Sequence, residues 1–241
     1  MSLAQDLVVA ARTLAEHGVI DAYGHASARS DRDPSRYLMP RNVAPELVTE
    51  EDILEYDLDS NPIDAKGRAI YHERFIHGEI YKARADVMAV VHNHSHAVVP
   101  YSCTSIALQP IFHMAAFVGL GVPTWDIRDA QKGTDMLVRT PYLGEHLAKG
   151  LGRHPAVLMR GHGSTVVAEN LPRAVGRAVY LDINARMQSQ AIALAGNDKP
   201  IVFMDDAEVQ ANVAWQNYER SWSLWKTRVV ARLAEEEGKK R

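Results

Sequence analysis

The sequence predicts an α/β fold, in which helices and strands alternate along the chain. Segments with the 3.6-residue apolar period of an amphipathic helix alternate with short apolar runs of strand length. The chain of 241 residues has no internal repeat, low-complexity segment or linker, and it is long enough to bury one full core. We therefore expect residues 1–241 to form a single domain with helices packed on a sheet.

The first part of the chain is expected to form one helix followed by short strands. Ser2 and Gln5 have the spacing of a capping box, and an apolar helical face follows them as far as Gly18. A second helical pattern starts at Glu73 and leads into a buried strand at 87–91. The other strands expected here are 26–29, 37–39 and 53–57.

The second part of the chain carries clear helix start and stop signals. Thr140 and Pro141 suit the N-cap and first position of a helix that runs to about Lys149. Asn170 starts a long helix that Gly196-Asn197 should end. The remaining elements expected are a helix at 97–102, strands at 156–159 and 164–168, and a C-terminal helix at about 206–237.

The C-terminal helix carries aromatic residues, among them Trp222 and Trp225, at helical spacing. These residues either pack the helix against its own sheet or reach a neighbouring subunit's active site across an interface, where aromatic anchors are common. The last residues, 235–241, are highly charged and are expected to be solvated and frayed.

Composition excludes several classes of partner. The net charge of −3 gives no electrostatic basis for binding nucleic acid or an anionic membrane. No apolar run approaches the roughly 20 residues of a membrane helix, and the start of the chain lacks the pattern of a signal peptide. The single cysteine, Cys103, cannot form an internal disulfide, and it fits the reducing cytoplasm in which we expect the protein.

The strand at 87–91 continues into His92-Asn93-His94, which carries the strongest chemical signal. Because side chains alternate along a strand, His92 and His94 should point to the same side. His162 lies between two glycines after another expected strand, where the chain can approach a centre closely. Three neutral imidazoles suit zinc, manganese, iron, cobalt or nickel, and three protein ligands leave coordination positions open for catalysis. His96 has the same parity but falls where the strand should end.

Glu73 opens the helix that leads into this strand, and His77 follows one turn later. A carboxylate near a metal can act as a fourth ligand or as a general acid and base. Alternatively, Glu73 is a glutamate favoured at a helix start by the helix dipole. The residues alone leave both interpretations open.

The order Glu73, His77, His92-Asn93-His94 and His162, with Tyr23-Gly24-His25-Ala26-Ser27 before it, resembles the class II aldolase/adducin family over about residues 3–196. The resemblance implies a three-layer α/β/α fold with a central, mainly antiparallel sheet of nine strands. It implies a fourfold homotetramer with active sites at subunit interfaces and one divalent metal ion per subunit, zinc or manganese, with iron or cobalt as alternatives. It also implies His92, His94 and His162 as the metal ligands and Glu73 as the catalytic acid and base.

The chain departs from the sugar-phosphate aldolases of this family at three places. Their small phosphate-binding donors are replaced by Gly24-His25-Ala26-Ser27, by Arg41-Asn42 and by Tyr71-His72. We therefore expect a substrate without a phosphate. Arg41 and Arg29 could instead hold a carboxylate, with Ser27 also at the substrate and Tyr71 and His72 lining a pocket for a flat ring. Arg29 could equally be a surface strand residue, and Arg41 could pair with a local acid such as Glu46.

This variant resembles the decarboxylase branch of the family, whose members act on hydroxylated aromatic or pyridine dicarboxylates. The sequence therefore predicts a metal-dependent carbon–carbon lyase that decarboxylates such a carboxylate through a metal-stabilised enolate. The proton would come from Glu73, or otherwise from His25 or His72. The alternatives are aldol cleavage of a hydroxy-keto acid without phosphate and, in another class, a metal-free adducin-like interaction module.

Overall fold

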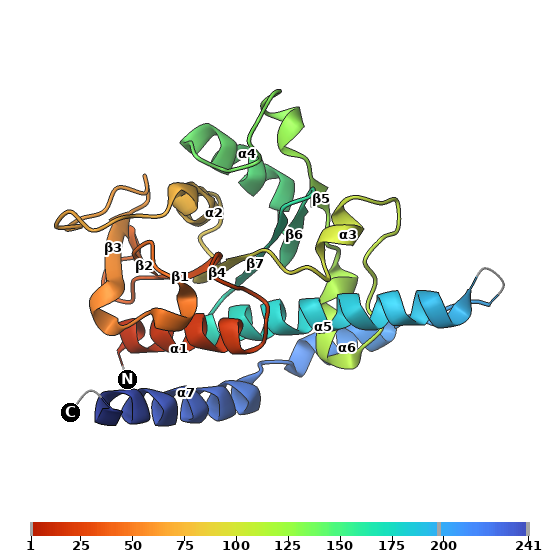
Figure 1. The fold of residues 1–241 in the computed structure, drawn as a ribbon. Helices are drawn as coiled ribbons and strands as arrows, with labels where there is room; N and C mark the ends of the chain where they lie inside the picture. The colour runs from red at the N-terminus through yellow and green to blue at the C-terminus, as the bar shows by residue number, and fades with distance from the viewer. Residues whose placement is uncertain (1, 197–198, 240–241) are drawn as a thin grey trace.

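A seven-stranded sheet lies at the centre of the computed structural model, which describes residues 2–196 and 199–239 (Figure 1). The strand order is β3-β2-β1-β4-β7-β6-β5, and every neighbouring pair is antiparallel except β5 with β6. The strands are β1 (His25–Arg29), β2 (Arg36–Pro40), β3 (Ile53–Asp57), β4 (Ala89–Asn93), β5 (Thr124–Trp125), β6 (Ala156–Met159) and β7 (Gly163–Ala168). The predicted mainly antiparallel sheet is confirmed, but the described residues form seven strands rather than the nine that were expected.

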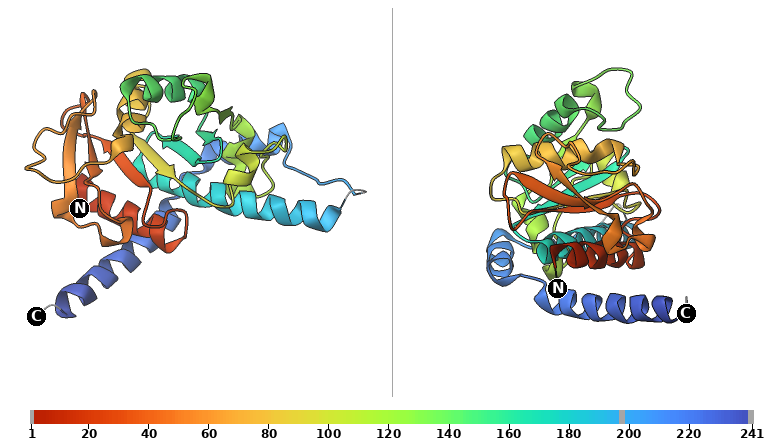
Figure 2. Two further views of the ribbon diagram at one scale, coloured as in Figure 1. Left: turned by 45° about the horizontal axis from the view of Figure 1, so that its top comes forward. Right: turned by 90° about the vertical axis from the view of Figure 1, so that its left-hand side faces the viewer.

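Helices cover both faces of this sheet, as the three-layer α/β/α prediction requires (Figures 1 and 2). One face is covered by α2 and α4, and the other by α1 and α5, with α7 outside α1. The α-helices are α1 (Leu3–Glu16), α2 (Phe75–Ala83), α3 (Val99–Ser102), α4 (Pro141–Leu151), α5 (Leu171–Ala195), α6 (Asp206–Trp215) and α7 (Glu219–Lys239). Short 3-10 helices are η1 (Pro45–Leu47), η2 (Glu50–Asp52), η3 (His72–Arg74), η4 (His113–Leu120) and η5 (Ile127–Asp129).

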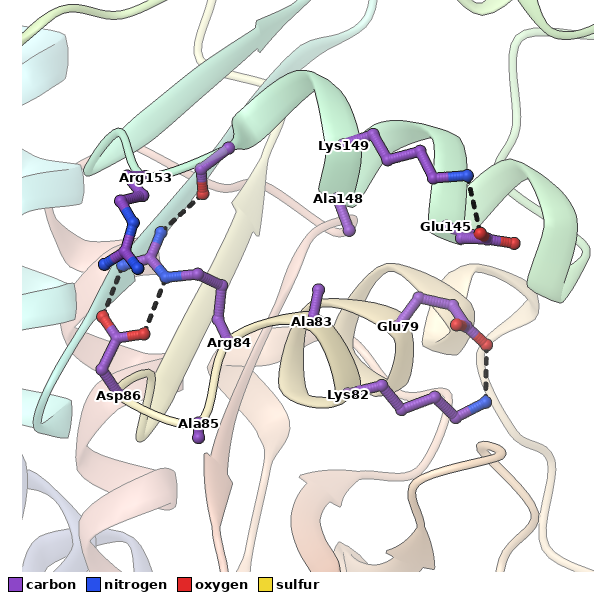
Figure 3. A pocket seen from close by; sticks show the side chains of 11 residues that line it. Glu79, Lys82, Ala83, Arg84, Ala85, Asp86, Glu145, Ala148, Lys149 and Arg153 are labelled. Atoms are coloured by element: carbon purple, nitrogen blue, oxygen red, sulfur yellow. Dashed lines mark hydrogen bonds and ion pairs between the residues drawn. The ribbon is translucent and has the colours of Figure 1, made fainter.

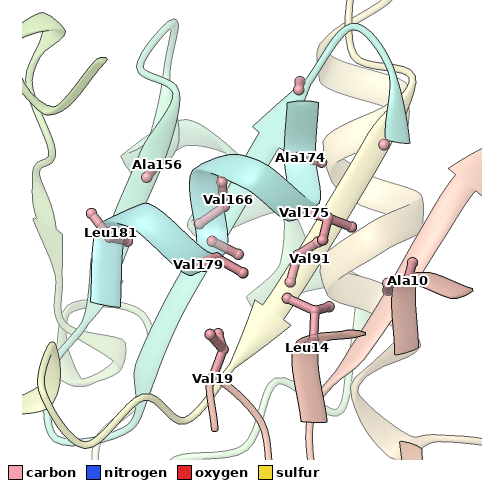
Figure 4. Packing of buried hydrophobic residues seen from close by; sticks show 14 of the residues in the cluster. Ala10, Leu14, Val19, Val91, Ala156, Val166, Ala174, Val175, Val179 and Leu181 are labelled. Atoms are coloured by element: carbon pink, nitrogen blue, oxygen red, sulfur yellow. The ribbon is translucent and has the colours of Figure 1, made fainter. Parts of the chain in front are cut away.

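The larger apolar core lies between the sheet and the α1/α5 layer. Val91 and Val166 of the sheet pack there with Leu14 of α1 and with Val175 and Val179 of α5 (Figure 4). Burying one such side chain fully contributes about 1.5–3 kcal/mol. This core fixes the positions of β4 and β7 in the middle of the sheet.

The opposite face of the sheet, beneath α2 and α4, carries several of the polar side chains singled out in the sequence. Val90 belongs to the core beneath α2 and α4, whereas its neighbours Ala89 and Val91 belong to the core beneath α1 and α5. Because the side-chain period of a strand is two, His92 lies on the same face as Val90. Ala26 and Ala28 belong to the α1/α5 core, so His25, Ser27 and Arg29 also face the α2/α4 layer.

Most helix boundaries predicted from the sequence are confirmed. Ser2 and Gln5 form the predicted capping box. The side chain of Thr140 accepts the Leu143 N–H, and Asn170 caps α5 in the same way. Gly196 ends α5 with a φ of 60°, and Asn197 lies outside the described residues. The strand expected at 87–91 lies two residues later, because pairing with β1 and β7 carries β4 through His92.

The C-terminal prediction needs correction, because two helices replace the single helix expected at about 206–237. The chain breaks between α6 and α7, where Tyr218 has a φ of 59°. The Gln216 amide donates to the backbone carbonyls of His113 and Met114, and the Tyr218 hydroxyl also donates to that of Met114. These bonds tie the break to η4, which a helical repeat in the sequence cannot reveal.

The second helix, α7, packs on the α1/α5 layer rather than on the sheet itself. Trp222 and Trp225 are buried in the larger core, and Lys226 pairs with Asp6 of α1 at 2.7 Å. Near the end of α7, Glu236 pairs with the buried Arg12. The helix therefore persists to Lys239, beyond the point where fraying was expected. None of the helices in the described part of the chain has both the length and the hydropathy for a bilayer crossing.

Candidate metal centre

The sheet brings three polar side chains into one row across its centre. His25 of β1 is the cross-strand partner of His92 in β4, and His92 is the partner of Thr165 in β7. The rings of His25 and His92 lie 5.2 Å apart between centroids, and the Thr165 hydroxyl lies 3.4 Å from His92 Nδ1. This contact orients the His92 ring, so that its Nε2 is the nitrogen that faces the other histidines.

Four side chains converge beyond the end of β4. The Nε2 atom of His94 lies 3.2 Å from that of His92 and 3.0 Å from that of His162. One carboxylate oxygen of Glu73 lies 3.6 Å from Nε2 of His92 and 3.6 Å from Nε2 of His162. Ligand atoms of all four residues lie within 4.8 Å of one another. The structure thus brings together the four residues for which the sequence predicted a metal-centred role.

The Gly-His-Gly turn delivers His162 to this cluster for two different steric reasons. Gly161 has a φ of 64°, in the left-handed region that favours glycine. Gly163 packs directly against the end of β4, and a Cβ there would overlap the Asn93 carbonyl oxygen and lie 2.9 Å from the Cα of His94. The second glycine therefore sets the separation between the two segments that carry His94 and His162.

Glu73 is held in place through the carboxylate oxygen that does not face the histidines. Its Oε1 accepts the Val138 N–H at 2.9 Å, which leaves Oε2 facing the histidines. Burial raises the pKa of Glu73 above its ordinary value, although the Val138 N–H lowers it in part. The helix-start interpretation of Glu73 is therefore incomplete, because the carboxylate points to the cluster from η3 and does not cap α2.

The donor set fits a divalent metal. Burial is the largest influence on the pKa values of His92, His94 and His162 and lowers each below the ordinary imidazole value, so their nitrogen lone pairs are free to bind. Ligands about 2.0–2.1 Å from a tetrahedral zinc lie about 3.3 Å from one another. The separations of 3.0, 3.2 and 3.6 Å in the cluster bracket that value.

The cluster opens into a cleft of about 370 Å³. This volume is at the lower end for small-molecule sites. The cleft is lined by Asp21, His94, His96, Val99, Met136, Leu137, Gly161 and His162. His96 thus lies at the cleft but outside the four-residue cluster in the described part of the chain.

A larger cleft of about 860 Å³ lies between the ends of α2 and α4, and none of the cluster residues lines it (Figure 3). Its charged side chains largely neutralise one another. Lys82 pairs with Glu79, Arg84 with Asp86, and Lys149 with Glu145. Among the described residues Arg153 is the one charged lining side chain without an ion pair, so the surface carries mixed charge rather than a cluster of one sign.

The predicted catalytic residue His25 and the predicted substrate residue Tyr71 lie beside the metal cluster. His25 is buried against the ring of Tyr71, with 4.5 Å between ring centroids, and the Tyr71 hydroxyl donates to the Val43 carbonyl. His72, in contrast, is exposed. Ser27 is fully buried, and its hydroxyl contacts the side chains of His77 and Tyr81, so it supports the site from behind rather than contacting substrate.

The prediction that Arg29 binds substrate is contradicted by the structure. Its guanidinium is buried and donates to four backbone carbonyls, those of Pro34, Tyr81, Arg84 and Val87. Arg29 shares a face with His25, but four residues of strand separate their Cα atoms by about 13 Å. Arg29 therefore braces the far end of β1.

Arg41 pairs with an acid, but with Asp52 rather than with Glu46. Its Nε donates to Asp52 Oδ1 at 2.6 Å, and 34% of the side chain remains exposed. Within residues 2–196 and 199–239 its terminal nitrogens have no hydrogen-bond partner. One edge of the guanidinium is therefore free for a ligand.

Sequence reasoning missed Tyr81 and the Val138 N–H. His77 and Tyr81 are four residues apart on α2, and His25 and Ser27 are two apart on β1, so each pair shares a face. That spacing is visible in the sequence. The contact between Val138 and Glu73 joins residues 65 positions apart, and it has no local signal.

Comparison with known proteins gives a consistent set of similarities. The family model described as "Class II Aldolase and Adducin N-terminal domain" matches residues 5–189. The decarboxylase tropJ of Talaromyces stipitatus is 37% identical over 234 residues, which cover 88% of each chain. A 3,4-dihydroxyphthalate decarboxylase of Arthrobacter keyseri is 28% identical over 232 residues, which cover 93% of each chain.

The fold is also that of a solved aldolase. An L-fuculose 1-phosphate aldolase from Glaciozyma antarctica superimposes with a TM-score of 0.79 at 21% identity, over 97% of this chain and 90% of the other. At this identity the likeness supports the fold alone.

Proposed function

The chain belongs to the class II aldolase and adducin family and is a metal-dependent lyase, and on this premise we propose that it decarboxylates a hydroxylated aromatic or heteroaromatic carboxylate. The observation that carries the proposal is the convergence of three histidine nitrogens and one glutamate carboxylate at a small-molecule cleft. The similarity to proteins named as decarboxylases favours loss of carbon dioxide over aldol cleavage.

His92, His94 and His162 would hold the metal, with Glu73 at its edge. A bound divalent metal supplies a Lewis acid for the ring oxygen on which negative charge develops as carbon dioxide leaves. We propose zinc or manganese, because neutral imidazoles with one carboxylate suit both metals.

Glu73 is the candidate for the proton transfer that follows. A proton must reach the ring carbon from which the carboxylate has departed. The raised pKa of Glu73 favours a carboxyl group that can hold and return a proton, while the Val138 N–H keeps the carboxyl group oriented. Exposed His72 is a weaker candidate, because nothing described in the structure fixes its side chain toward the cluster.

Arg41 is the candidate for binding a second carboxylate of the substrate. Its free edge can form a two-point hydrogen-bonded pair with a carboxylate, and the pair with Asp52 holds the guanidinium in place. The ring of Tyr71, beside His25, offers a flat apolar surface for an aromatic substrate.

A panel of substrates tests this proposal. The purified protein, loaded with zinc or manganese, is incubated with 3,4-dihydroxyphthalate, a hydroxypyridine dicarboxylate and a hydroxy-keto acid. We expect carbon dioxide from one of the aromatic acids and none from a His92→Ala variant. Aldehyde release from the hydroxy-keto acid without any decarboxylation would replace the proposal with the aldolase alternative. Failure to bind metal after loading would favour an adducin-like module.

We further propose that the chain forms a homotetramer with active sites at the subunit interfaces. Large apolar side chains are exposed on the part of the molecule around α5 and α6, which include Leu194 at 85%, Val202 at 86% and Trp215 at 59%. Such exposure is typical of association surfaces. Sedimentation of the full chain and of a chain ending before Asn212 tests this: a monomeric full chain would refute the tetramer.

A further inference from the structure

A chain of four buried hydrogen-bonding side chains leads away from the metal centre into the core. His25 Nδ1 lies 2.6 Å from His77 Nε2, and His77 Nδ1 lies 2.6 Å from the Ser27 hydroxyl. The Ser27 hydroxyl lies 2.7 Å from that of Tyr81. His77 and Ser27 have no exposed surface, and Tyr81 is 1% exposed. Buried polar side chains are costly to leave without hydrogen-bond partners. These four side chains must therefore satisfy one another's donors and acceptors.

Two secondary elements supply the chain by their own periodicities. His25 and Ser27 lie on one face of β1, and His77 and Tyr81 lie one turn apart on α2, which covers that face. Tyr37 lies within 5.3 Å of Tyr81 and 6.4 Å of His77, as measured between ring centroids. Aromatic packing therefore leaves the His77 ring little freedom to turn.

The Tyr81 hydroxyl, at the buried end of this row of side chains, determines the direction of the hydrogen bonds in the row. In the described residues, the oxygen of Ser27 is the only acceptor for the Tyr81 O–H, because the other group that contacts this hydroxyl, the Val90 N–H, is a donor. If Ser27 donated to Tyr81, the buried phenol O–H would have no acceptor, which disfavours that arrangement by about tenfold or more. Tyr81 therefore donates to Ser27, and Ser27 donates its own hydrogen to Nδ1 of His77.

This direction carries through to the metal centre. A neutral His77 that accepts at Nδ1 has its hydrogen on Nε2 and donates it to Nδ1 of His25. A neutral His25 that accepts at Nδ1 has its own hydrogen on Nε2, the opposite edge of the ring. Full burial keeps the His77 ring neutral by lowering its pKa to about 3.

We propose that His77 is a positioning residue that, with Ser27 and Tyr81, holds His25 as the tautomer protonated on Nε2, so that His25 is a fixed hydrogen-bond donor for an anionic oxygen of the substrate. His25 is then neither the base nor the proton source of the reaction. Its position beside His92 places the donor at the metal centre, where the substrate's carboxylate or ring oxygen would bind. The substrate part of this inference rests on the proposed decarboxylation, whereas the tautomer does not.

The tautomer can be measured without turnover. Zinc-loaded protein labelled with ¹⁵N-histidine gives long-range ¹H–¹⁵N spectra that distinguish protonated from unprotonated ring nitrogens. A His25→Gln variant assigns the His25 signals. We expect His25 to carry its hydrogen on Nε2 in the unmodified protein. A hydrogen on Nδ1 would overturn the proposal.

Three variants test whether the hydrogen-bonded row causes this preference. His77→Leu removes the donor to His25 and should leave His25 as a mixture of tautomers with metal content unchanged, whereas His77→Gln retains an amide donor for His25 and should restore the Nε2 tautomer. Tyr81→Phe leaves the Ser27 hydroxyl with His77 Nδ1 as the only acceptor for its hydrogen, so this variant should keep His25 protonated on Nε2. His25 protonated on Nδ1 in Tyr81→Phe would overturn the proposal even if His77→Leu fails to fold.

Kinetics test the donor role separately. With the aromatic acid that releases carbon dioxide, His77→Leu should lower kcat/KM at least about tenfold, and His77→Gln should stay within about threefold of the unmodified protein. Equal losses in the two variants would refute a positioning role. If no aromatic acid releases carbon dioxide, the proposed function fails, while the spectra still decide the tautomer.

Discussion

Replacing Gly163 with alanine should move His162 away from His94 in the metal centre. Gly163 packs against the end of β4, where a Cβ would overlap the Asn93 carbonyl oxygen and lie 2.9 Å from the Cα of His94. Both obstacles are backbone atoms, so no side chain can rotate to make room. The chain segments that carry His94 and His162 must therefore move apart.

The size of the effect follows from the overlap. To reach the 3.0 Å that real Cβ atoms keep, the turn and β4 would have to separate by about 1 Å. Overpacking of this kind typically costs about 1–3 kcal/mol of stability. Metal sites tolerate ligand displacements of only about 0.2 Å. We therefore expect zinc affinity to fall at least about tenfold, together with this loss of stability.

Zinc titration against a competing chelator measures the first effect, and urea unfolding of the metal-free protein measures the second. Gly238→Ala is the matched control. A Cβ at Gly238 meets nothing within 4 Å, and the position is exposed on α7. This control should bind zinc normally and change stability by no more than about 1 kcal/mol. Unaltered zinc affinity in Gly163→Ala would refute the role assigned to the close approach.

Three further predictions concern the substrate, acid stability and the metal. Arg41→Gln should raise KM for an aromatic dicarboxylate about tenfold with a smaller change in kcat, measured by carbon dioxide release. Burial raises the pKa of Asp52, but hydrogen bonds from Thr49 and Arg41 outweigh burial and hold it below its ordinary value. The stability that this carboxylate contributes is therefore present above about pH 4 and is lost as pH falls through the folded-state pKa, so Asp52→Asn should lack that part of the acid-induced loss in urea unfolding. Saturating zinc at about 100 times its Kd should stabilise the protein by about 2.7 kcal/mol, and His162→Ala should abolish this gain.

The sequence predicts the metal cluster well because its signals are local and periodic. His92 and His94 share a side because a strand alternates, and His162 reaches them because β4 and β7 pair in the sheet. Helix caps such as Thr140 are equally local, since the capping side chain lies three residues from the N–H that it binds.

The hydrogen-bond partners of Arg29 could not be predicted from local sequence patterns. Its residue type and its face of β1 are correct for a substrate ligand, but the partners of a guanidinium depend on which carbonyls the fold places around it. Those carbonyls belong to the turn after β1, to α2 and to the segment that joins α2 with β4. No pattern within β1 predicts contacts of this kind.

The break at Tyr218 and the strand β5 were missed for related reasons. Neither glycine nor proline marks the break, which depends on hydrogen bonds to η4 about 100 residues earlier in the chain. β5 comprises only Thr124–Trp125, too few residues to show a period of two. Both features depend on tertiary contacts rather than on local propensity.

The most direct test of the central claim is metal-dependent carbon dioxide release, measured on metal-free protein as zinc or manganese is added in steps with 3,4-dihydroxyphthalate as substrate. The cluster of Glu73, His92, His94 and His162 predicts that release rises in proportion to added metal, reaches a plateau at one ion per chain, and is absent from His94→Ala at every step. Release that is undiminished in metal-free protein, or that persists in His94→Ala, would contradict the claim.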